Sequence, residues 1–203
     1  NLSGKDVQYA ADFGYRIKLL AVVAKHDADI EVGVHPTLVP FDHMLASVNG
    51  VFNAAMVRGD MVGDTMFYGR GAGRLPTAST VVGDIGDIAR NMAHGEVRYA
   101  RAVPTYGEGV TKLRAPGDIV SRFYLRFNVV DKAGAFGTMT TILGRNGVSI
   151  SAAAQKTANV DEKGFVPVVV LTHPAPAKAV DAALAEIREA GILNESPVKL
   201  RML

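Results

Sequence analysis

The sequence contains no cysteine, and the features that mark membrane or secreted proteins are missing as well. Without cysteine the chain can form no disulfide framework, no thiolate zinc site and no cysteine nucleophile, and this composition is compatible with a cytoplasmic protein. No apolar run approaches the roughly 20 residues of a membrane span. The first residues have no signal-peptide architecture and no initiator methionine. We therefore expect a globular segment of a longer cytoplasmic protein, without a membrane partner.

The chain also has no large excess of positive or negative charge. The 22 basic and 20 acidic residues leave a formal net charge of +2, and no run of lysine or arginine concentrates it. Binding of nucleic acid would need a basic stripe interleaved with exposed aromatic residues, so we expect no nucleic-acid partner. Hydrophobic residues make up 48% of the chain and charged residues 21%, which is typical of a folded globular protein.

The part of the chain from residue 121 onward has the clearest periodicity. Its apolar residues predict strands at 123–129, 148–154, 165–171 and 198–202, with a turn at 159–164. Helical spacing predicts helices at 136–143 and 180–187. The order βαββαβ is that of a ferredoxin-like domain, in which both helices lie on one face of a four-stranded sheet. We expect the other face of that sheet to remain available for pairing.

The first hundred residues predict a mixture of helices and strands. A helix should end near Gly14, and the apolar run 17–24 has the pattern of a strand that is covered on both faces. A strand at 30–36, a hairpin over 52–68 and a helix over 77–92 should follow. From residue 103 to residue 117, proline and glycine residues interrupt the helical and strand periodicity. The predicted division is a mixed-sheet segment at 1–102, a linker at 103–120 and the ferredoxin-like domain at 121–203, an α+β fold.

A glycine-rich segment, Gly69–Gly73, lies between the predicted hairpin and helix. Backbone N–H groups at the start of that helix could bind an anion or a cofactor carbonyl, and glycine would let such a ligand approach the backbone. The spacing is not that of a dinucleotide-binding fingerprint, because the third glycine comes one residue too early. A tight structural turn and a ligand contact both remain open for this segment.

Five runs in the first block resemble homoserine dehydrogenase: 14–21, 34–40, 48–53, 67–73 and 75–79. In the second block, 124–126 and 131–134 resemble the ACT domain that is appended to bacterial homoserine dehydrogenases. For the whole enzyme the resemblance implies NAD(P)-dependent interconversion of L-aspartate 4-semialdehyde and L-homoserine, in the biosynthesis of threonine, methionine and isoleucine. This piece would supply oligomerisation and amino-acid feedback regulation.

The resemblance also implies where a cofactor would touch this chain. The family's nicotinamide-side glycine corresponds to Gly71, with Gly69 and Gly73 as neighbours. The family's nucleotide-binding domain and its catalytic lysine and aspartate lie upstream of residue 1. We therefore assign no catalytic residue and no metal site to this chain, and expect NAD(P) to be bound by the full-length enzyme and not by this fragment alone.

A small amino-acid effector, threonine by family resemblance, is expected at the turn before the first helix of the second block. The turn delivers backbone N–H groups and a helix N-terminus to one place, which suits a carboxylate. The site residues would be Asp131, Gly134, Ala135 and Phe136, with Asn146 at the far end of the helix. Related ACT domains have proline where Ala133 stands. A purely structural turn and cap remains the alternative, because every helix end needs a cap.

Three functions therefore remain open from the sequence: a fragment of an oxidoreductase, an amino-acid-sensing regulatory module, and an oligomerisation module without a ligand. The sheet predicted for the first block is larger than its one long helix can cover. Unpaired sheet faces and edges favour self-association, so we expect a homo-oligomer, either a dimer or a tetramer.

Overall fold

The computed structural model describes residues 2–26, 29–93, 112–155 and 164–203. The chain separates into two compact units, of which the first contains Asn1–Asp42 and Thr111–Leu203 and the second contains His43–Val110. Both combine helices with largely antiparallel sheet, so the predicted α+β class is confirmed. Within the described ranges, no helix has the length and apolar character needed to cross a membrane.

The predicted βαββαβ order is confirmed in the first unit. Its elements are β6 (Val120–Val130), α3 (Ala135–Arg145), β7 (Ile150–Gln155), β8 (Phe165–Thr172), α4 (Ala177–Glu189) and β10 (Val198–Met202). The strands lie in the order β10-β6-β8-β7, and each pair of neighbours is antiparallel. The short strand β9 (Ala175–Pro176) pairs with the start of β6. Of the predicted turn at 159–164, only Gly164 falls within the described residues.

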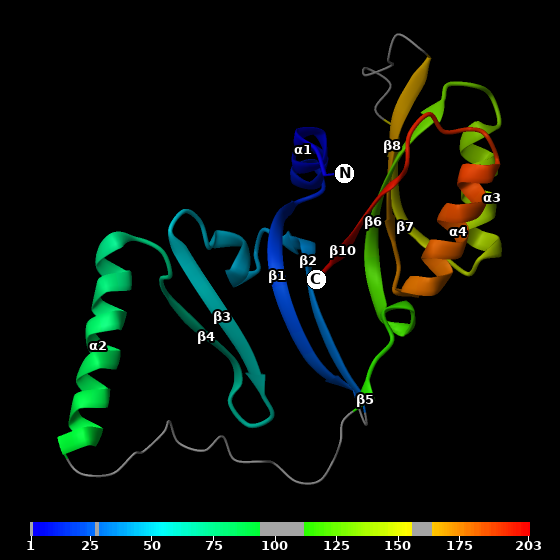
Figure 1. The fold of residues 1–203 in the computed structure, drawn as a ribbon. Coiled ribbons are helices and arrows are strands. Elements are labelled where there is room, and N and C mark those ends of the chain that lie inside the picture. Colours follow the sequence, from blue (N-terminus) through cyan, green and yellow to red (C-terminus); the bar gives the residue numbers. More distant parts are fainter. Residues whose placement is uncertain (1, 27–28, 94–111, 156–163) are drawn as a thin grey trace. The chain divides into compact units, whose positions relative to one another are not determined.

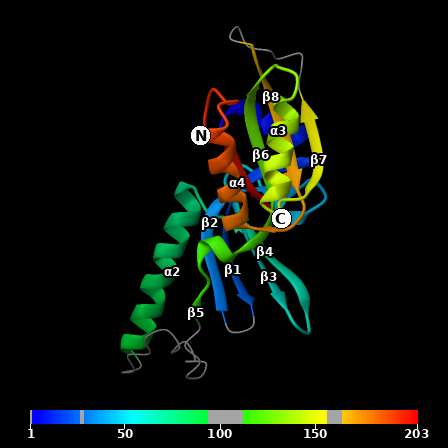
Figure 2. The same cartoon turned by 90° about the vertical axis from the view of Figure 1, so that its right-hand side faces the viewer.

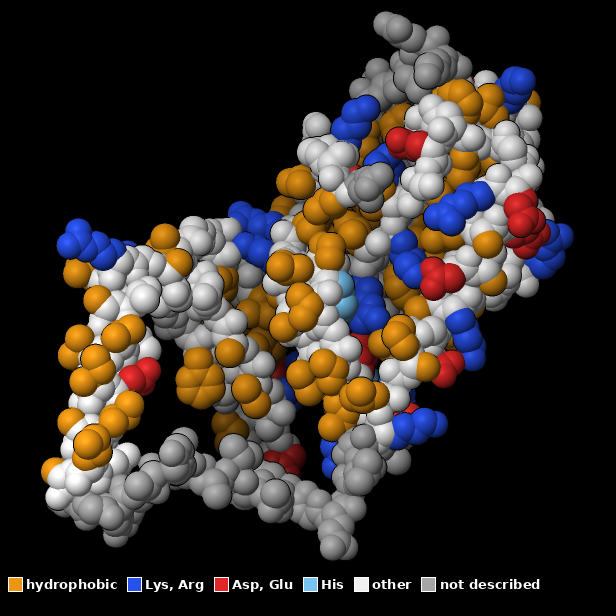
Figure 3. Space-filling model, viewed as in Figure 1, with side chains coloured by type: hydrophobic (Ala, Val, Ile, Leu, Met, Phe, Trp, Pro, Cys, Tyr) orange, Lys and Arg blue, Asp and Glu red, His pale blue; other side chains and the backbone are white. Residues whose placement is uncertain are grey.

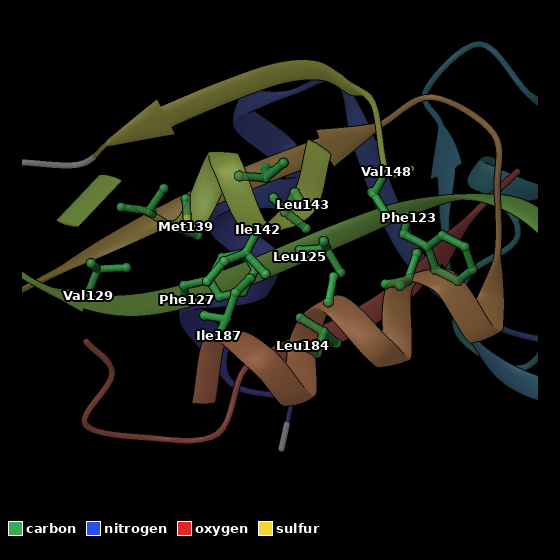
Figure 4. Close-up of a cluster of buried hydrophobic side chains, with 14 of the residues drawn as sticks. Phe123, Leu125, Phe127, Val129, Met139, Ile142, Leu143, Val148, Leu184 and Ile187 are labelled. Atoms are coloured by element: carbon green, nitrogen blue, oxygen red, sulfur yellow. The ribbon is translucent and has the colours of Figure 1, made fainter. Parts of the chain in front are cut away.

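Helices α3 and α4 pack on one face of this sheet and enclose its main hydrophobic core. Figure 4 shows side chains from β6 meeting those of both helices. Phe123, Phe127 and Met139 are fully buried there, and each contributes roughly 1.5–3 kcal/mol by leaving water. Alternate residues of β6 therefore point toward the helices, as the period of two in the sequence predicts.

The opposite face of the sheet is covered by α1 (Gly4–Asp12), which Figure 1 shows on the other side of the strands from α3 and α4. Tyr9 and Ala10 of α1 are buried in a second core, with Leu38, Tyr124, Val169, Leu171, Val198, Leu200 and Met202. The prediction that this face stays available for pairing is therefore wrong where α1 lies. The helix is amphipathic, and burying its apolar side against the sheet removes both surfaces from water.

A long hairpin continues the same sheet beyond β10. It consists of β1 (Tyr15–His26) and β2 (Asp29–Pro40), which are antiparallel, and Figure 2 shows it from a second direction. The link to β10 is parallel and short, because only Thr37 and Leu38 pair with Arg201 and Met202. The two-residue strand β5 (Lys112–Leu113) pairs with the other end of β2. One eight-stranded sheet thus contains strands from both blocks of the sequence.

The predicted burial of 17–24 on both faces is wrong for this chain. Leu19 is 73% exposed and Val23 is 74% exposed, while the alternate residues are partly covered. The reason is that, in the described part of the first unit, β1 pairs with β2 alone and no helix covers this face of the hairpin. With Val32 and Val34 of β2, the two residues form an exposed apolar surface, here called the hairpin face.

The second unit contains the predicted hairpin and helix. After the short η1 (Met44–Ser47), strands β3 (Phe52–Gly59) and β4 (Gly63–Arg70) pair over their whole length. Helix α2 (Arg74–Ala93) follows, and it buries none of its residues. Figure 3 shows hydrophobic side chains gathered along α2. Of the predicted linker at 103–120, residues 103–111 lie outside the described ranges, and the remainder contains β5 and the single turn η2 (Pro116–Asp118).

Candidate functional site

The glycine-rich segment of the second unit begins at the end of β4. Gly69 pairs with Asn53 across the hairpin. The N–H groups of Gly71 and Ala72 both donate to the carbonyl oxygen of Val51, at 3.1 and 3.5 Å. A Cβ atom at position 71 would lie 1.6 Å from the Asn53 side-chain nitrogen, so any larger residue there would displace the Asn53 side chain. Packing against Asn53 is therefore sufficient to explain this glycine.

The remaining donors of this segment lie at the start of α2. Gly73 has a φ of +128°, a conformation that favours glycine, and α2 begins at the next residue. The N–H groups of Arg74 and Leu75 have no hydrogen-bond acceptor among the described residues. Gly69 thus lies at the end of strand β4, and Gly71 and Gly73 lie in the connection that leads from β4 to α2. Only the last part of this connection offers donors that a cofactor carbonyl or an anion could use.

The predicted effector turn of the first unit connects β6 to α3. The Asp131 N–H donates to the Gly164 carbonyl at 2.9 Å, and the Ala135 N–H donates to the Lys132 carbonyl at 3.1 Å. Gly134 is the N-cap residue of α3, with a φ of +88°. A side chain at this position would strain the backbone. The turn is therefore closed by its own hydrogen bonds and depends on glycine even with alanine at position 133.

Two donors at the start of α3 remain available. The N–H groups of Phe136 and Gly137 have no acceptor among the described residues, whereas the next amide, that of Thr138, donates to the Gly134 carbonyl at 2.8 Å. Ala135 is buried and the Phe136 ring is 40% exposed beside these donors. A carboxylate placed here would accept two backbone hydrogen bonds and gain from the helix dipole.

Asn146 lies at the other end of α3, where it caps the helix. Its side-chain nitrogen donates to the Ile142 carbonyl at 3.0 Å and to a Glu186 carboxylate oxygen at 2.9 Å. Glu186 belongs to α4 and also pairs with Arg145. Gly134 and Asn146 are the two cap residues of α3, and the helix separates them by about 18 Å. Within one chain, Asn146 therefore links α3 to α4 and is not gathered with the other predicted effector residues.

A buried ion pair that the sequence did not reveal fixes α1 to the sheet. Arg126 donates through Nε to Asp6 at 2.6 Å, and its Nη1 donates to Glu195 at 2.7 Å. The Tyr124 hydroxyl and the Ser3 N–H also donate to Asp6. Burial alone would raise the pKa of Asp6, but the hydrogen bonds from Arg126 and Ser3 hold it below its usual value. The pair is 120 residues apart in sequence, so no local pattern predicts it.

A second polar cluster that the sequence analysis missed lies where β2 meets β10. Arg201 donates through Nη1 to Glu31 at 2.6 Å and to His35 Nε2 at 2.9 Å. Because arginine can only donate, His35 Nε2 must be unprotonated, and Nδ1 then donates to the Thr37 hydroxyl at 2.9 Å. Burial and the neighbouring Arg201 cation lower the pKa of His35, although Glu31 opposes this shift. In the local sequence, the alternation of Arg201 with apolar residues of β10 indicates only that Arg201 lies in a strand.

Comparison with known proteins identifies relatives over nearly the whole chain. The family model for homoserine dehydrogenase matches residues 1–85, and that for the ACT domain matches residues 123–189. Homoserine dehydrogenase from Neisseria gonorrhoeae is 40% identical over 99% of this chain, and that from Pseudomonas aeruginosa is 36% identical over 99%. The crystal structure of a homoserine dehydrogenase from Thiobacillus denitrificans aligns with a TM-score of 0.84, at 34% identity, over 100% of this chain.

These matches also give the extent of the relationship. The chain spans about half of the length of these relatives, 46% in each of the three. The two family models occur in the same order as the two predicted blocks. The chain is therefore a relative of the homoserine dehydrogenases, corresponding to about half of such a protein and containing a homoserine dehydrogenase segment followed by an ACT domain.

Proposed function

We propose that this chain is the C-terminal half of a homoserine dehydrogenase. The complete enzyme would interconvert L-aspartate 4-semialdehyde and L-homoserine with NAD(P), in the cytoplasmic biosynthesis of threonine and methionine. The observation that carries this proposal is the likeness to homoserine dehydrogenases over nearly the whole of this chain, combined with its βαββαβ unit. The proposed division remains a substrate-domain segment at 1–102, a linker at 103–120 and the regulatory domain at 121–203.

In this proposal the half-enzyme contributes one turn to the cofactor site and no chemistry of its own. The donors at the start of α2 would approach the nicotinamide side of NAD(P), with Gly71 as the neighbouring backbone. Hydride transfer needs a complete dinucleotide-binding domain to position the donor. The purified chain should therefore show no homoserine-dependent reduction of NAD or NADP. Turnover above background by this polypeptide would contradict the proposal.

The second proposed role is assembly into a homo-oligomer. Leu19, Val23, Val32 and Val34 leave the hairpin face apolar, and α2 exposes Val82, Ile85 and Ile88 by about 60% or more. Figure 3 shows hydrophobic side chains over both elements. Surfaces of this kind favour association. Light scattering at micromolar concentration should give a dimer or a larger species, and a mass near 21.5 kDa would exclude the proposed assembly.

The third proposed role is sensing of a small amino acid, threonine by family resemblance, at the turn before α3. Support comes from the N–H groups of Phe136 and Gly137, which have no acceptor within the described ranges and directly follow the left-handed Gly134 turn. Asn146 would reach the ligand only from a second, paired ACT domain. The alternative is an oligomerisation module without a ligand, and the exposed hairpin face favours that role equally.

A further inference from the structure

One cavity of the first unit lies between the start of α4 and the strands β2 and β10. It has a volume of about 270 Å³, just under the range of roughly 300–1,000 Å³ that is usual for drug-sized ligands. Its floor is formed by β10 and by His35 of β2, and its walls by η2 and the first turns of α4. None of the predicted effector or cofactor residues lines it.

Arg201 is the residue that gives this cavity a chemical character. Its side chain is only 20% exposed, and its Nη1 group uses both protons, one for Glu31 and one for His35. The Nε and Nη2 groups have no acceptor among the described residues. These two nitrogens form the edge of the guanidinium group that binds a carboxylate through two parallel hydrogen bonds.

The other lining residues fit a small organic anion. Lys199 adds a second cation, which pairs with Asp181, and Arg201 pairs with Glu31, so each cation of the lining already has one anionic partner. His35 is neutral here, because its Nε2 atom accepts from Arg201. Phe123, Pro36, Pro116, Ala177 and Leu200 supply an apolar wall. A short hydrocarbon chain would contact this wall while its charged end met the guanidinium group.

Glu31 and His35 hold Arg201 in place for this role. A flexible arginine loses side-chain entropy on binding, and fixing it in advance removes that cost. Both holding residues belong to β2, whereas Arg201 belongs to β10, so the cavity forms only when the hairpin and the ACT strands are joined. Occupation of the cavity would therefore stabilise the short parallel link at Thr37 and Leu38.

We propose that the cavity between β2, β10 and the start of α4 is a binding site for a short-chain carboxylate, which the Nε and Nη2 groups of Arg201 bind while Phe123 and Pro36 contact its hydrocarbon part. The site is independent of the proposed effector turn, because no residue is common to the two. The stability of the contact between β2 and β10, which joins the two sequence blocks, would then increase with ligand concentration.

The test is a titration of the full chain with butyrate, followed by two-dimensional NMR of the backbone amides and the arginine Nε–H groups. Butyramide has the same shape without the charge and is the matched ligand control. Butyrate should cause saturable shifts at Arg201 and its β10 neighbours at millimolar concentration, and butyramide should not. Shifts that do not saturate, or equal shifts with butyramide, would overturn the proposal. Inorganic phosphate that binds more tightly than butyrate would overturn the carboxylate assignment.

Three variants separate this site from general effects on the fold. Arg201→Lys keeps the charge but loses the two-nitrogen edge, and it should weaken butyrate at least tenfold. Arg122→Lys on the neighbouring strand β6 is the control and should bind as the wild type does. Asp181 is more than half exposed, so Asp181→Asn should fold normally and bind butyrate about threefold more tightly. Unchanged or weaker binding by Asp181→Asn would count against the site even if Arg201→Lys failed to fold.

Discussion

Replacing Asp6 by alanine should detach α1 from the outer face of the sheet. The carboxylate is fully buried and accepts two hydrogen bonds from Arg126, at 2.6 and 3.4 Å, as well as bonds from Ser3 and Tyr124. Removing one partner of a buried pair typically costs about 3–5 kcal/mol, because the other charge is left without compensation. Arg126 would keep its bond to the half-exposed Glu195, so we expect a cost near the lower end of that range.

The magnitude can be converted into a shift of melting temperature. For a chain of this size, 1 kcal/mol shifts Tm by about 2–4 °C, so Asp6→Ala should lower Tm of the first unit by roughly 6–12 °C. Scanning calorimetry measures this shift, and hydrogen exchange at the α1 amides should become faster. The control is Asp118→Ala, which breaks an exposed pair with Lys178 and should leave Tm unchanged. A shift below about 2 °C for Asp6→Ala would refute the proposed role of the pair.

Two further predictions concern Gly71 and His35. Gly71→Ala would place a Cβ 1.6 Å from the Asn53 side-chain nitrogen and should destabilise the second unit by roughly 1–3 kcal/mol in calorimetry. The control is Gly69→Ala, whose Cβ meets no atom within 4 Å and which should destabilise the unit less. Equal destabilisation by the two variants would contradict the explanation of Gly71 by its packing against Asn53. Because the folded state lowers the pKa of His35 from 6.5, the contribution of its contact with Arg201 is complete above that pH, and stability should fall as the pH drops below 6.5 toward the folded-state pKa. His35→Gln should flatten this part of the stability–pH curve, and an unchanged slope would exclude His35 as its source.

The sequence predicts those parts of the fold that depend on neighbouring residues. The strand–helix order of the ACT domain follows from apolar residues two or three to four positions apart, and β6, α3, β8 and α4 lie within a few residues of their predicted places. The hairpin β3–β4 was likewise predictable from its two alternating runs and the turn between them. Local periodicity also predicted α2, but it could not show that the apolar side of that helix stays exposed among the described residues.

The contacts that join the two blocks were not predictable. The parallel pairing of Thr37 with Arg201 and the ion pair of Asp6 with Arg126 connect residues more than 100 positions apart. In the local sequence, Thr37, Arg126 and Arg201 are ordinary polar residues of strands, and Asp6 is an ordinary acidic residue in the first turn of a helix. Only the three-dimensional structure shows that they are partners, and for the same reason the cavity around Arg201 could not be found from spacing.

The measurement that most directly tests the sensing role is calorimetric titration of the chain with threonine. We expect saturable heat at millimolar threonine for the wild type and its loss in Gly134→Val, because a side chain at a φ of +88° displaces the turn that presents the α3 amides. Gly191→Val is the matched control, since Gly191 has a φ of +67° after α4 and lies outside the proposed site. Absence of heat in the wild type, or equal binding by Gly134→Val, would contradict the proposed effector site.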